Sequence, residues 1–342
     1  MNESAAAGKP PTQRMMELIV GSWAERAVYA AAALDLPERL CAGDTDLTAL
    51  AAATGAHQGA LRRLMDYLVA LGVCAGNAAD GYRNTPLGEV LRPGVPGSVR
   101  DYALLAGQEF HRAWGEILHT LRTGEPAFDR AFGEDLYTYL GRSPEAAHRF
   151  NQAMNAGQVL FEQVPQLHDF TGADRIVDIG GGNGELLAEV LRRSATTRAV
   201  LLEQGPALAD AAEFLAGHGP GIADRCEIVD GDMFRAVPEG ADVYVLARVL
   251  VNWDDERAGH LLRNCAAAMR PDSTLLLVER PQAEGPPMPV PSAVDLLMMT
   301  VTSGGRSRTL AEYEGLLERA GLVLGAHRQL PQGYRLLSAT RR

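Results

Sequence analysis

A glycine-rich turn between an apolar run and a helical stretch, RIVDIGGGNGELLAEVL (residues 175–191), constrains the fold of this chain more than any other segment. Glycine is needed where the backbone takes a positive φ or closely approaches a ligand, and the first amide groups of the following helix are free to bind it. The segment therefore predicts a buried strand, a turn that holds a nucleotide-like ligand, and a helix. The residues concerned are Asp178, Gly180, Gly182 and Gly184.

The spacing of these glycines disfavours NAD or FAD. The dinucleotide fingerprint G-x-G-x-x-G requires a third glycine where this chain has Glu185 or Leu187. A glycine turn alone is weak evidence, because many such turns are only tight connections between a strand and a helix.

Two downstream segments point to adenosine. Glu203 ends the next apolar run, where a carboxylate can accept hydrogen bonds from both ribose hydroxyls. A third apolar run is followed by an acidic residue and two polarizable apolar side chains, which would suit the polar edge and the face of an adenine ring. This third segment comprises Gly231, Asp232, Met233 and Phe234.

Beyond residue 174, short apolar or β-branched runs alternate with helical stretches. This alternation predicts βαβ units, with a parallel sheet covered by helices on both faces. The runs are RIVDIG, AVLLEQ, CEIVDGDMF, DVYVLARVLV and TLLLVERP.

Residues 12–160 are instead helical in pattern. Residues 44–73 have the pattern of a helix-turn-helix, and residues 81–91 predict a β-turn or short hairpin, so the whole resembles a winged helix. DNA binding is disfavoured, because the nine basic and ten acidic side chains of residues 1–100 give a net charge of −1. Packing against a second subunit is the favoured role, and a winged-helix regulator stays open as an alternative.

Composition excludes several other classes. The chain has 342 residues, 46% of them hydrophobic, and a net charge of −11, which disfavours nucleic acid and anionic membranes as partners. Its four cysteines are widely spaced and no His or carboxylate pair has metal-ligand spacing, so we expect neither disulfides nor a metal. The first residues lack the pattern of a signal peptide and no apolar run reaches 18 residues, which predicts a cytoplasmic protein.

The ordered set DIGGGNG, GDMF, ARVLVNWDDERA, LLLVE and GGRSRT resembles the S-adenosylmethionine-dependent small-molecule O-methyltransferases of the caffeate and acetylserotonin type. The resemblance implies an α/β fold: a helical winged-helix dimerisation domain (12–100), connecting helices that line the acceptor pocket (101–170), and a Rossmann-like cofactor-binding domain (171–342). It implies a homodimer and S-adenosylmethionine as cofactor. It assigns Gly180, Glu203, Asp232 and Met233 to that cofactor, with Ala247, Arg248 and Trp253 nearby.

The chain departs from the family pattern where the catalytic base should be. Val251 and Asn252 stand where members usually have His-Asp, and Ser307 replaces the glutamate that orients that His. Of the three family residues only Glu279 remains. We therefore expect methyl transfer by proximity to an already acidic acceptor, a carboxylate or activated phenol, with Asn252 binding its oxygen. His111 is a candidate substitute base.

Two questions stay open at this point. The same losses occur in relatives in which the cofactor assists hydroxylation, decarboxylation or a pericyclic step, so a non-methylating enzyme is the alternative. The sequence also does not separate oxygen from nitrogen as the acceptor atom. The candidate substrate-binding residues are Phe110, Trp114, Phe150, Met154, Asn252, Met298 and Met299.

Overall fold

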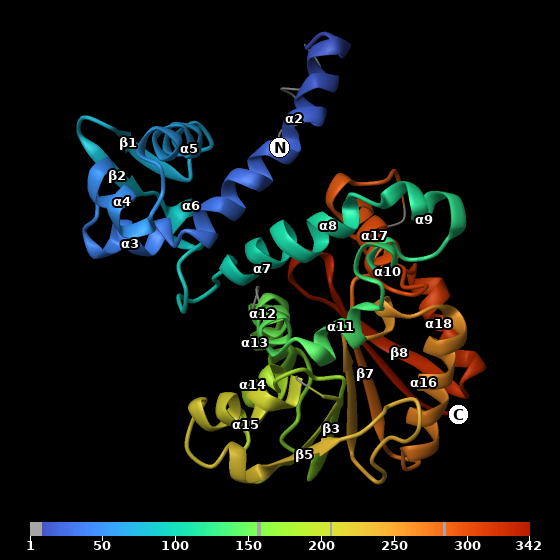
Figure 1. The fold of residues 1–342 in the computed structure, drawn as a ribbon. Coiled ribbons are helices and arrows are strands. Elements are labelled where there is room, and N and C mark those ends of the chain that lie inside the picture. The colour runs from blue at the N-terminus through green and yellow to red at the C-terminus, as the bar shows by residue number, and fades with distance from the viewer. Residues whose placement is uncertain (1–8, 156–158, 206, 283–284) are drawn as a thin grey trace. The chain divides into compact units, whose positions relative to one another are not determined.

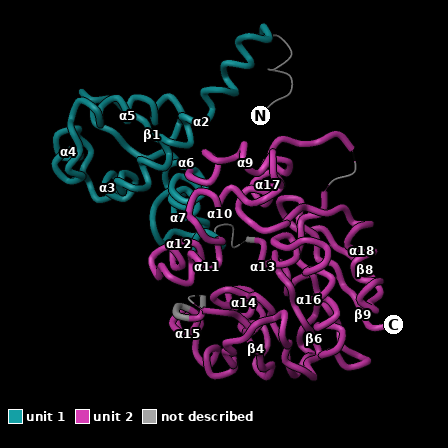
Figure 2. Tube along the Cα trace, turned by 45° about the vertical axis from the view of Figure 1, so that its right-hand side comes forward, with its two compact units in different colours: residues 1–111, 152–157 teal, residues 112–151, 158–342 magenta. Residues whose placement is uncertain are grey.

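The computed structural model describes residues 9–155, 159–205, 207–282 and 285–342. The chain forms two compact units, one of residues 1–111 with 152–157 and one of residues 112–151 with 158–342 (Figure 2). No helix in the described parts of the chain combines the length and apolar character needed to cross a membrane.

The first unit is mainly helical and contains one small hairpin (Figure 1). Asp46 caps the N-terminus of the helix Leu47–Thr54 by accepting hydrogen bonds from the amides of Thr48 and Ala49, both at 2.9 Å. The elements are α2 (Pro11–Ala33), α3 (Leu36–Ala42), α4 (Leu47–Thr54), α5 (Gln58–Ala70), β1 (Cys74–Asn77), β2 (Gly81–Asn84), α6 (Pro86–Glu89), α7 (Arg100–Leu105) and the π-helical turn η1 (Ala106–Phe110).

The hairpin lies earlier than the sequence indicated. Its antiparallel strands pair Cys74 with Asn84 and Asn77 with Gly81, and residues 86–89, which we expected in the turn or hairpin, form α6 instead. Gly76 and Gly81 both have positive φ, and a Cβ on Gly76 would collide with the Gly81 carbonyl. The close approach of these two glycines places the hairpin here.

Helices also connect the N-terminal elements to the sheet. These are α8 (His111–Trp114), α9 (Ile117–Thr123), α10 (Ala127–Phe132), α11 (Leu136–Arg142), α12 (Pro144–Asn155) and α13 (Val159–Leu167).

The second unit is built on a seven-stranded sheet of order β5-β4-β3-β6-β7-β9-β8, with β9 antiparallel to both its neighbours. The expected Rossmann-like fold is therefore confirmed, with an antiparallel pair added at one edge. The strands are β3 (Arg175–Ile179), β4 (Arg198–Glu203), β5 (Cys226–Asp230), β6 (Val243–Ala247), β7 (Thr274–Glu279), β8 (Leu322–Gln329) and β9 (Arg335–Arg341).

Helices cover both faces of this sheet (Figure 1). They include α14 (Glu185–Arg193), α15 (Ala207–Gly217), α16 (Asp255–Ala268) and α18 (Leu310–Arg319), whereas α17 (Pro289–Val301) contacts α9 and α10. The short 3₁₀ turns are η2 (Ala223–Arg225), η3 (Leu250–Asn252) and η4 (Pro331–Gly333).

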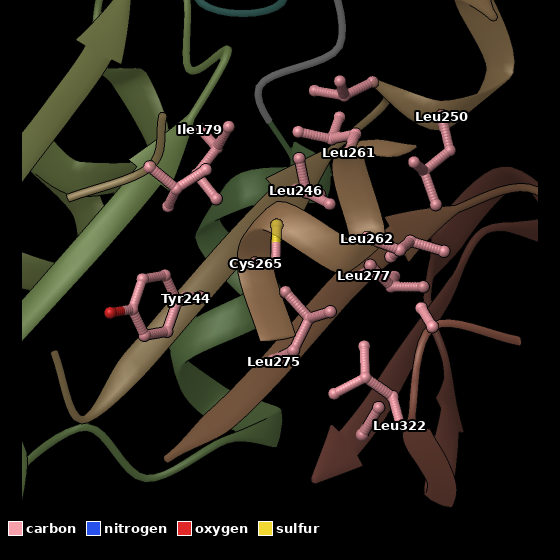
Figure 3. Packing of buried hydrophobic residues seen from close by; sticks show 14 of the residues in the cluster. Ile179, Tyr244, Leu246, Leu250, Leu261, Leu262, Cys265, Leu275, Leu277 and Leu322 are labelled. Atoms are coloured by element: carbon pink, nitrogen blue, oxygen red, sulfur yellow. The ribbon is translucent and has the colours of Figure 1, made fainter. Parts of the chain in front are cut away.

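Each buried strand contributes alternate residues to two cores. On β6, Tyr244 and Leu246 pack with α16 and α18 residues such as Leu261 in one core (Figure 3). Val243 and Val245 point into the other core, with residues of α13, α14 and α15. Strand order reverses between β3 and β6, and ligands of open α/β sheets bind at the carboxyl ends of strands at such a point.

Candidate functional site

The glycine turn follows β3 at this reversal point. Gly180, Gly182 and Gly184 have φ values of +68°, +61° and +88°, and Gly184 caps the start of α14. Other residues rarely adopt this left-handed conformation, so the predicted turn has its predicted cause. A Cβ on Gly181 would collide with the Asp178 carboxylate, so the turn lies directly against that side chain.

Asp178 is a buried acid that no described residue stabilises. Its side chain is 1% exposed, and neither carboxylate oxygen receives a hydrogen bond within the described ranges. Burial, together with the charge of Glu203, raises the pKa of Asp178 to about 7. Buried polar atoms are normally paired, so these oxygens fit a ligand that brings a donor or a positive charge.

Glu203, at the end of β4, is tied to the same turn. One of its oxygens accepts a hydrogen bond from the Gly182 amide at 3.0 Å and the other from the Gln204 amide at 2.8 Å. Burial raises the pKa of Glu203 above its usual range. The sheet thus brings together the strand-end carboxylate and the glycine turn, which are 21 residues apart in sequence.

The GDMF segment forms the next part of this region. The Asp232 carboxylate accepts a hydrogen bond from the Phe234 amide at 2.8 Å, and the Met233 sulfur lies 3.8 Å from where a Cβ on Gly180 would be. Asn264 of α16 donates to the carbonyl oxygens of Met233 and Phe234, both at 3.0 Å. Sequence reasoning missed Asn264, because an amide in the middle of an amphipathic helix carries no recognisable signal.

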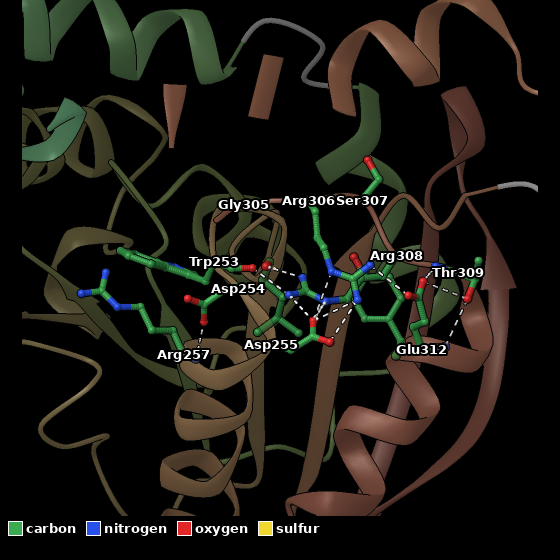
Figure 4. Close-up of polar contacts among 12 residues, drawn as sticks. Trp253, Asp254, Asp255, Arg257, Gly305, Arg306, Ser307, Arg308, Thr309 and Glu312 are labelled. Atoms are coloured by element: carbon green, nitrogen blue, oxygen red, sulfur yellow. Dashed lines mark hydrogen bonds and ion pairs between the residues drawn. The ribbon is translucent and has the colours of Figure 1, made fainter. Parts of the chain in front are cut away.

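An aromatic cluster continues the region. The Trp253 ring lies edge-on to Phe234 at 4.8 Å between centroids and stacks on Tyr137 of α11 at 5.6 Å. The Arg257 guanidinium lies 5.1 Å from the Trp253 centroid (Figure 4). Trp253 Nε1 is buried and has no acceptor among the residues the structure places. Sequence reasoning did not assign Tyr137 to the cofactor region, because α11 carries no cofactor motif.

The segment between β6 and α16 carries Asn252 and Trp253. Arg248, just past Ala247, has a φ of +61°, which is unusual for a residue with a side chain. Asn252 donates its side-chain amide to the Arg248 carbonyl at 3.0 Å. The turn is therefore closed by its own residues.

Glu279, at the end of β7, is 1% exposed and supports this turn. Its carboxylate accepts hydrogen bonds from the Leu250 amide at 2.8 Å and from the Tyr313 hydroxyl at 3.1 Å. Burial raises its pKa to about 7. The contacts of Glu279 fix backbone, whereas its predicted catalytic part stays a prediction.

The candidate acceptor residues divide between the two units. His111 is exposed, and its Nδ1 lies 3.7 Å from the Glu25 carboxylate within the first unit. Phe110 is buried and Met154 partly buried in that unit as well. The remaining candidates, all partly buried in the second unit, are Trp114, Phe150, Asn252, Met298 and Met299. Their contact with an acceptor stays a prediction.

Comparison with known proteins decides the family. A model of the O-methyltransferase domain matches residues 114–323, and one of the O-methyltransferase dimerisation domain matches residues 16–93. The chain belongs to the O-methyltransferase family. It is an S-adenosylmethionine-dependent methyltransferase, as its motifs implied.

Among its relatives, this methyltransferase is 40% identical to a 3-amino-4-hydroxybenzoate 4-O-methyltransferase of Streptomyces cremeus, over 98% of this chain and 92% of that protein. It is 34% identical to the aclacinomycin 10-hydroxylase RdmB of Streptomyces purpurascens, over 95% and 90%.

A solved structure extends the comparison. The O-methyltransferase NcsB1 of neocarzinostatin biosynthesis, in complex with S-adenosylmethionine and 2-hydroxy-5-methyl naphthoic acid, is similar with a TM-score of 0.81 and 30% identity. The match covers 93% of this chain and 96% of that one.

Proposed function

We propose that this methyltransferase transfers a methyl group to an acidic oxygen of an aromatic or polyketide-like natural product, without a histidine general base. The observation that carries the proposal is the turn after β6. Val251 stands at the family's base position, and the Asn252 amide nitrogen already donates to the Arg248 carbonyl. Neither side chain can remove a proton from a phenol.

The energetic argument concerns the ionisation of the acceptor. A free phenol with a pKa near 10 is ionised to about one part in 10³ at pH 7, which costs roughly 4 kcal/mol. A general base typically contributes a factor of about 10² to 10⁴, so its absence has a similar cost. An acceptor that ionises below pH 7 avoids this cost, and the enzyme then has only to position its oxygen.

The relatives support an aromatic hydroxy acid as the class of substrate. One acts on an aminohydroxybenzoate, and NcsB1 was solved with a hydroxynaphthoic acid. Both molecules carry a hydroxyl and a carboxyl group on an aromatic ring.

When bound, S-adenosylmethionine supplies the electrophilic methyl group. The residues that would hold it are the Gly180–Gly184 turn, Glu203, and Asp178, whose oxygens receive no hydrogen bond from the described residues. Ala247 ends the neighbouring strand β6, and Arg248 follows it. Asp232, Met233, Phe234 and Trp253 would border the adenine, and Gly231 continues β5 toward them.

We propose further that the enzyme is a homodimer and that α2 forms part of its interface. Met15, Leu18, Ile19 and Trp23 follow a helical spacing on α2 and are 57–65% exposed in the single chain. Large exposed apolar side chains in such a stripe indicate a protein partner. The match of residues 16–93 to a dimerisation domain supports a second copy as that partner.

The test is an incubation of the enzyme with S-adenosylmethionine and a panel of aromatic acids and phenols, read by mass spectrometry. A mass gain of about 14 units in the products of the acidic acceptors supports the proposal.

The second candidate function, a cofactor-assisted hydroxylation, is favoured by the likeness to RdmB. With dioxygen and a two-electron reductant supplied, it predicts a gain of about 16 mass units with the cofactor unconsumed. Methylation of simple phenols at the same rate as of acids would contradict the proposal.

A further inference from the structure

Arg308 is a fully buried cation whose side chain reaches the turn between β6 and α16. Its side chain is 0% exposed. Nη1 donates to the Leu250 carbonyl at 2.8 Å and Nη2 to the Trp253 carbonyl at 2.7 Å, while Nε donates to Asp255 at 2.9 Å (Figure 4). The guanidinium therefore binds both ends of the segment that contains Asn252.

A buried guanidinium is an expensive way to stabilise a fold. Its carboxylate partner, Asp255, is 46% exposed and also pairs with Arg306. Two of the hydrogen bonds of Arg308 go to neutral carbonyls, which compensate lost hydration only in part. This cost indicates that the geometry of the turn matters, since charge-assisted hydrogen bonds hold backbone more strongly than neutral ones.

The same turn is held from the other side by a buried acid. The Glu279 carboxylate accepts from the Leu250 amide, so both peptide groups around Leu250 are fixed by ionisable side chains. Gly305 closes the packing, because a Cβ there would lie 2.8 Å from the Val251 carbonyl.

The loop that carries Arg308 also contacts the helix of the candidate acceptor residues. The Ser307 amide donates to the Asp295 carboxylate of α17 at 2.6 Å. Asp295 lies one helical turn before Met298 and Met299. One short loop thus links the predicted acceptor helix to the turn that carries Trp253.

We propose that Arg308 is a positioning residue, which holds the Leu250–Trp253 turn so that Trp253 borders the cofactor. The inference rests on the proposed cofactor placement. It gives a role to Arg308, which the family motifs do not assign. Arg308 itself touches neither the cofactor nor the acceptor. It acts through the carbonyls of Leu250 and Trp253.

The matched control is Arg306. It lies on the same loop and pairs with the same Asp255, and with Glu312 at 2.9 Å, yet among the described residues it donates to no carbonyl of the turn. We would compare R308M, R308K and R306Q. The probe is S-adenosylhomocysteine, measured by titration calorimetry with binding stoichiometry, so that no acceptor is needed.

A second readout is ¹⁹F NMR of protein labelled with 5-fluorotryptophan, in which the Trp253 resonance is assigned by its loss in W253F. We expect R308M to raise the Kd for S-adenosylhomocysteine by at least about tenfold at full stoichiometry, and R308K to lie between it and wild type. The Trp253 resonance should shift in both, whereas R306Q should change Kd by less than about twofold.

Two results would overturn the inference. One is a Kd and a Trp253 resonance in folded R308K that match R306Q. The other is the loss of folding in both Arg308 variants while R306Q folds, which would make Arg308 merely structural. A wild-type enzyme that binds the probe but methylates no acidic acceptor would count against the proposed function and leave the Arg308 comparison intact.

Discussion

The carboxylate of Glu203 accepts a hydrogen bond from the Gly182 amide at 3.0 Å, which joins the end of β4 to the turn after β3. Its other oxygen is bound to the Gln204 amide. The acid is thereby held at the edge of the glycine turn, where it can meet the ribose of a nucleoside. In the proposed function, the cofactor site is organised around this contact.

Replacing Glu203 tests its assignment to the cofactor. E203Q keeps the shape but replaces one acceptor oxygen by a donor, so we expect S-adenosylhomocysteine affinity to fall about 10- to 100-fold by calorimetry. E227Q is the control, because Glu227 lies on β5 with a side chain 66% exposed. Equal affinities of E203Q and wild type would remove Glu203 from the site.

The buried acid Asp178 predicts a dependence of stability on pH. Its pKa is about 7 in the folded state, through burial and the charge of Glu203, against an ordinary value of 3.8. Between these values the folded state binds the extra proton. The free energy of unfolding of the ligand-free enzyme should therefore fall as pH rises, by up to about 1.4 kcal/mol per pH unit from this group.

The D178N variant should lose part of that slope, measured by urea unfolding at pH 5, 6, 7 and 8. Glu279, whose pKa is also raised to about 7, supplies a comparable share, so E279Q is the parallel variant. A slope in D178N equal to that of wild type would show that Asp178 does not hold a proton in the folded enzyme.

Restoring the family residues tests whether their loss matters for the acceptor. The double substitution V251H/S307E supplies a base and its orienting acid. We expect the rate on weakly acidic phenols at pH 7 to rise by at least about tenfold, with little change for acidic acceptors. V251H alone should not abolish activity on an acidic acceptor unless its bulk blocks the site. An equal gain on both classes would contradict this account.

The apolar stripe on α2 predicts that the dimer is sensitive to charge there. I19D and L18D each place a carboxylate where the side chain is 58% or 65% exposed in the single chain. We expect light scattering to give about half the wild-type mass at micromolar concentration. Q13D, also on an exposed part of α2, is the control. A mass unchanged in both apolar variants would place the interface elsewhere.

The sequence predicted the parts of the fold that local chemistry dictates. The glycine turn needs left-handed backbone, and the five apolar runs need a sheet covered on both faces. Both features could therefore be predicted from the sequence. Strands β8 and β9 were missed: most of β8 is exposed, and β8 is held by pairing with β9 instead of by an apolar pattern of its own. The hairpin was misplaced, since its two four-residue strands, CAGN and GYRN, carry no alternating apolar pattern.

The candidate site, like the fold, was predicted only in part. Gly182 and Glu203 come together as strand-end positions require. Tyr137 and Asn264 reach the region from helices with ordinary amphipathic patterns, so only the fold reveals them. Arg308 was visible within a motif, but its role depends on which carbonyls it meets.

The central claim is that the acceptor arrives ionised and that no enzyme group removes its proton. The most direct measurement is the pH dependence of kcat/KM for two acceptors of different pKa, in wild type and in H111A. The account predicts that the midpoint of the acid limb follows the pKa of the acceptor, and that H111A leaves it unchanged. A midpoint that stays fixed between the two acceptors and disappears in H111A would contradict the claim and make His111 the base.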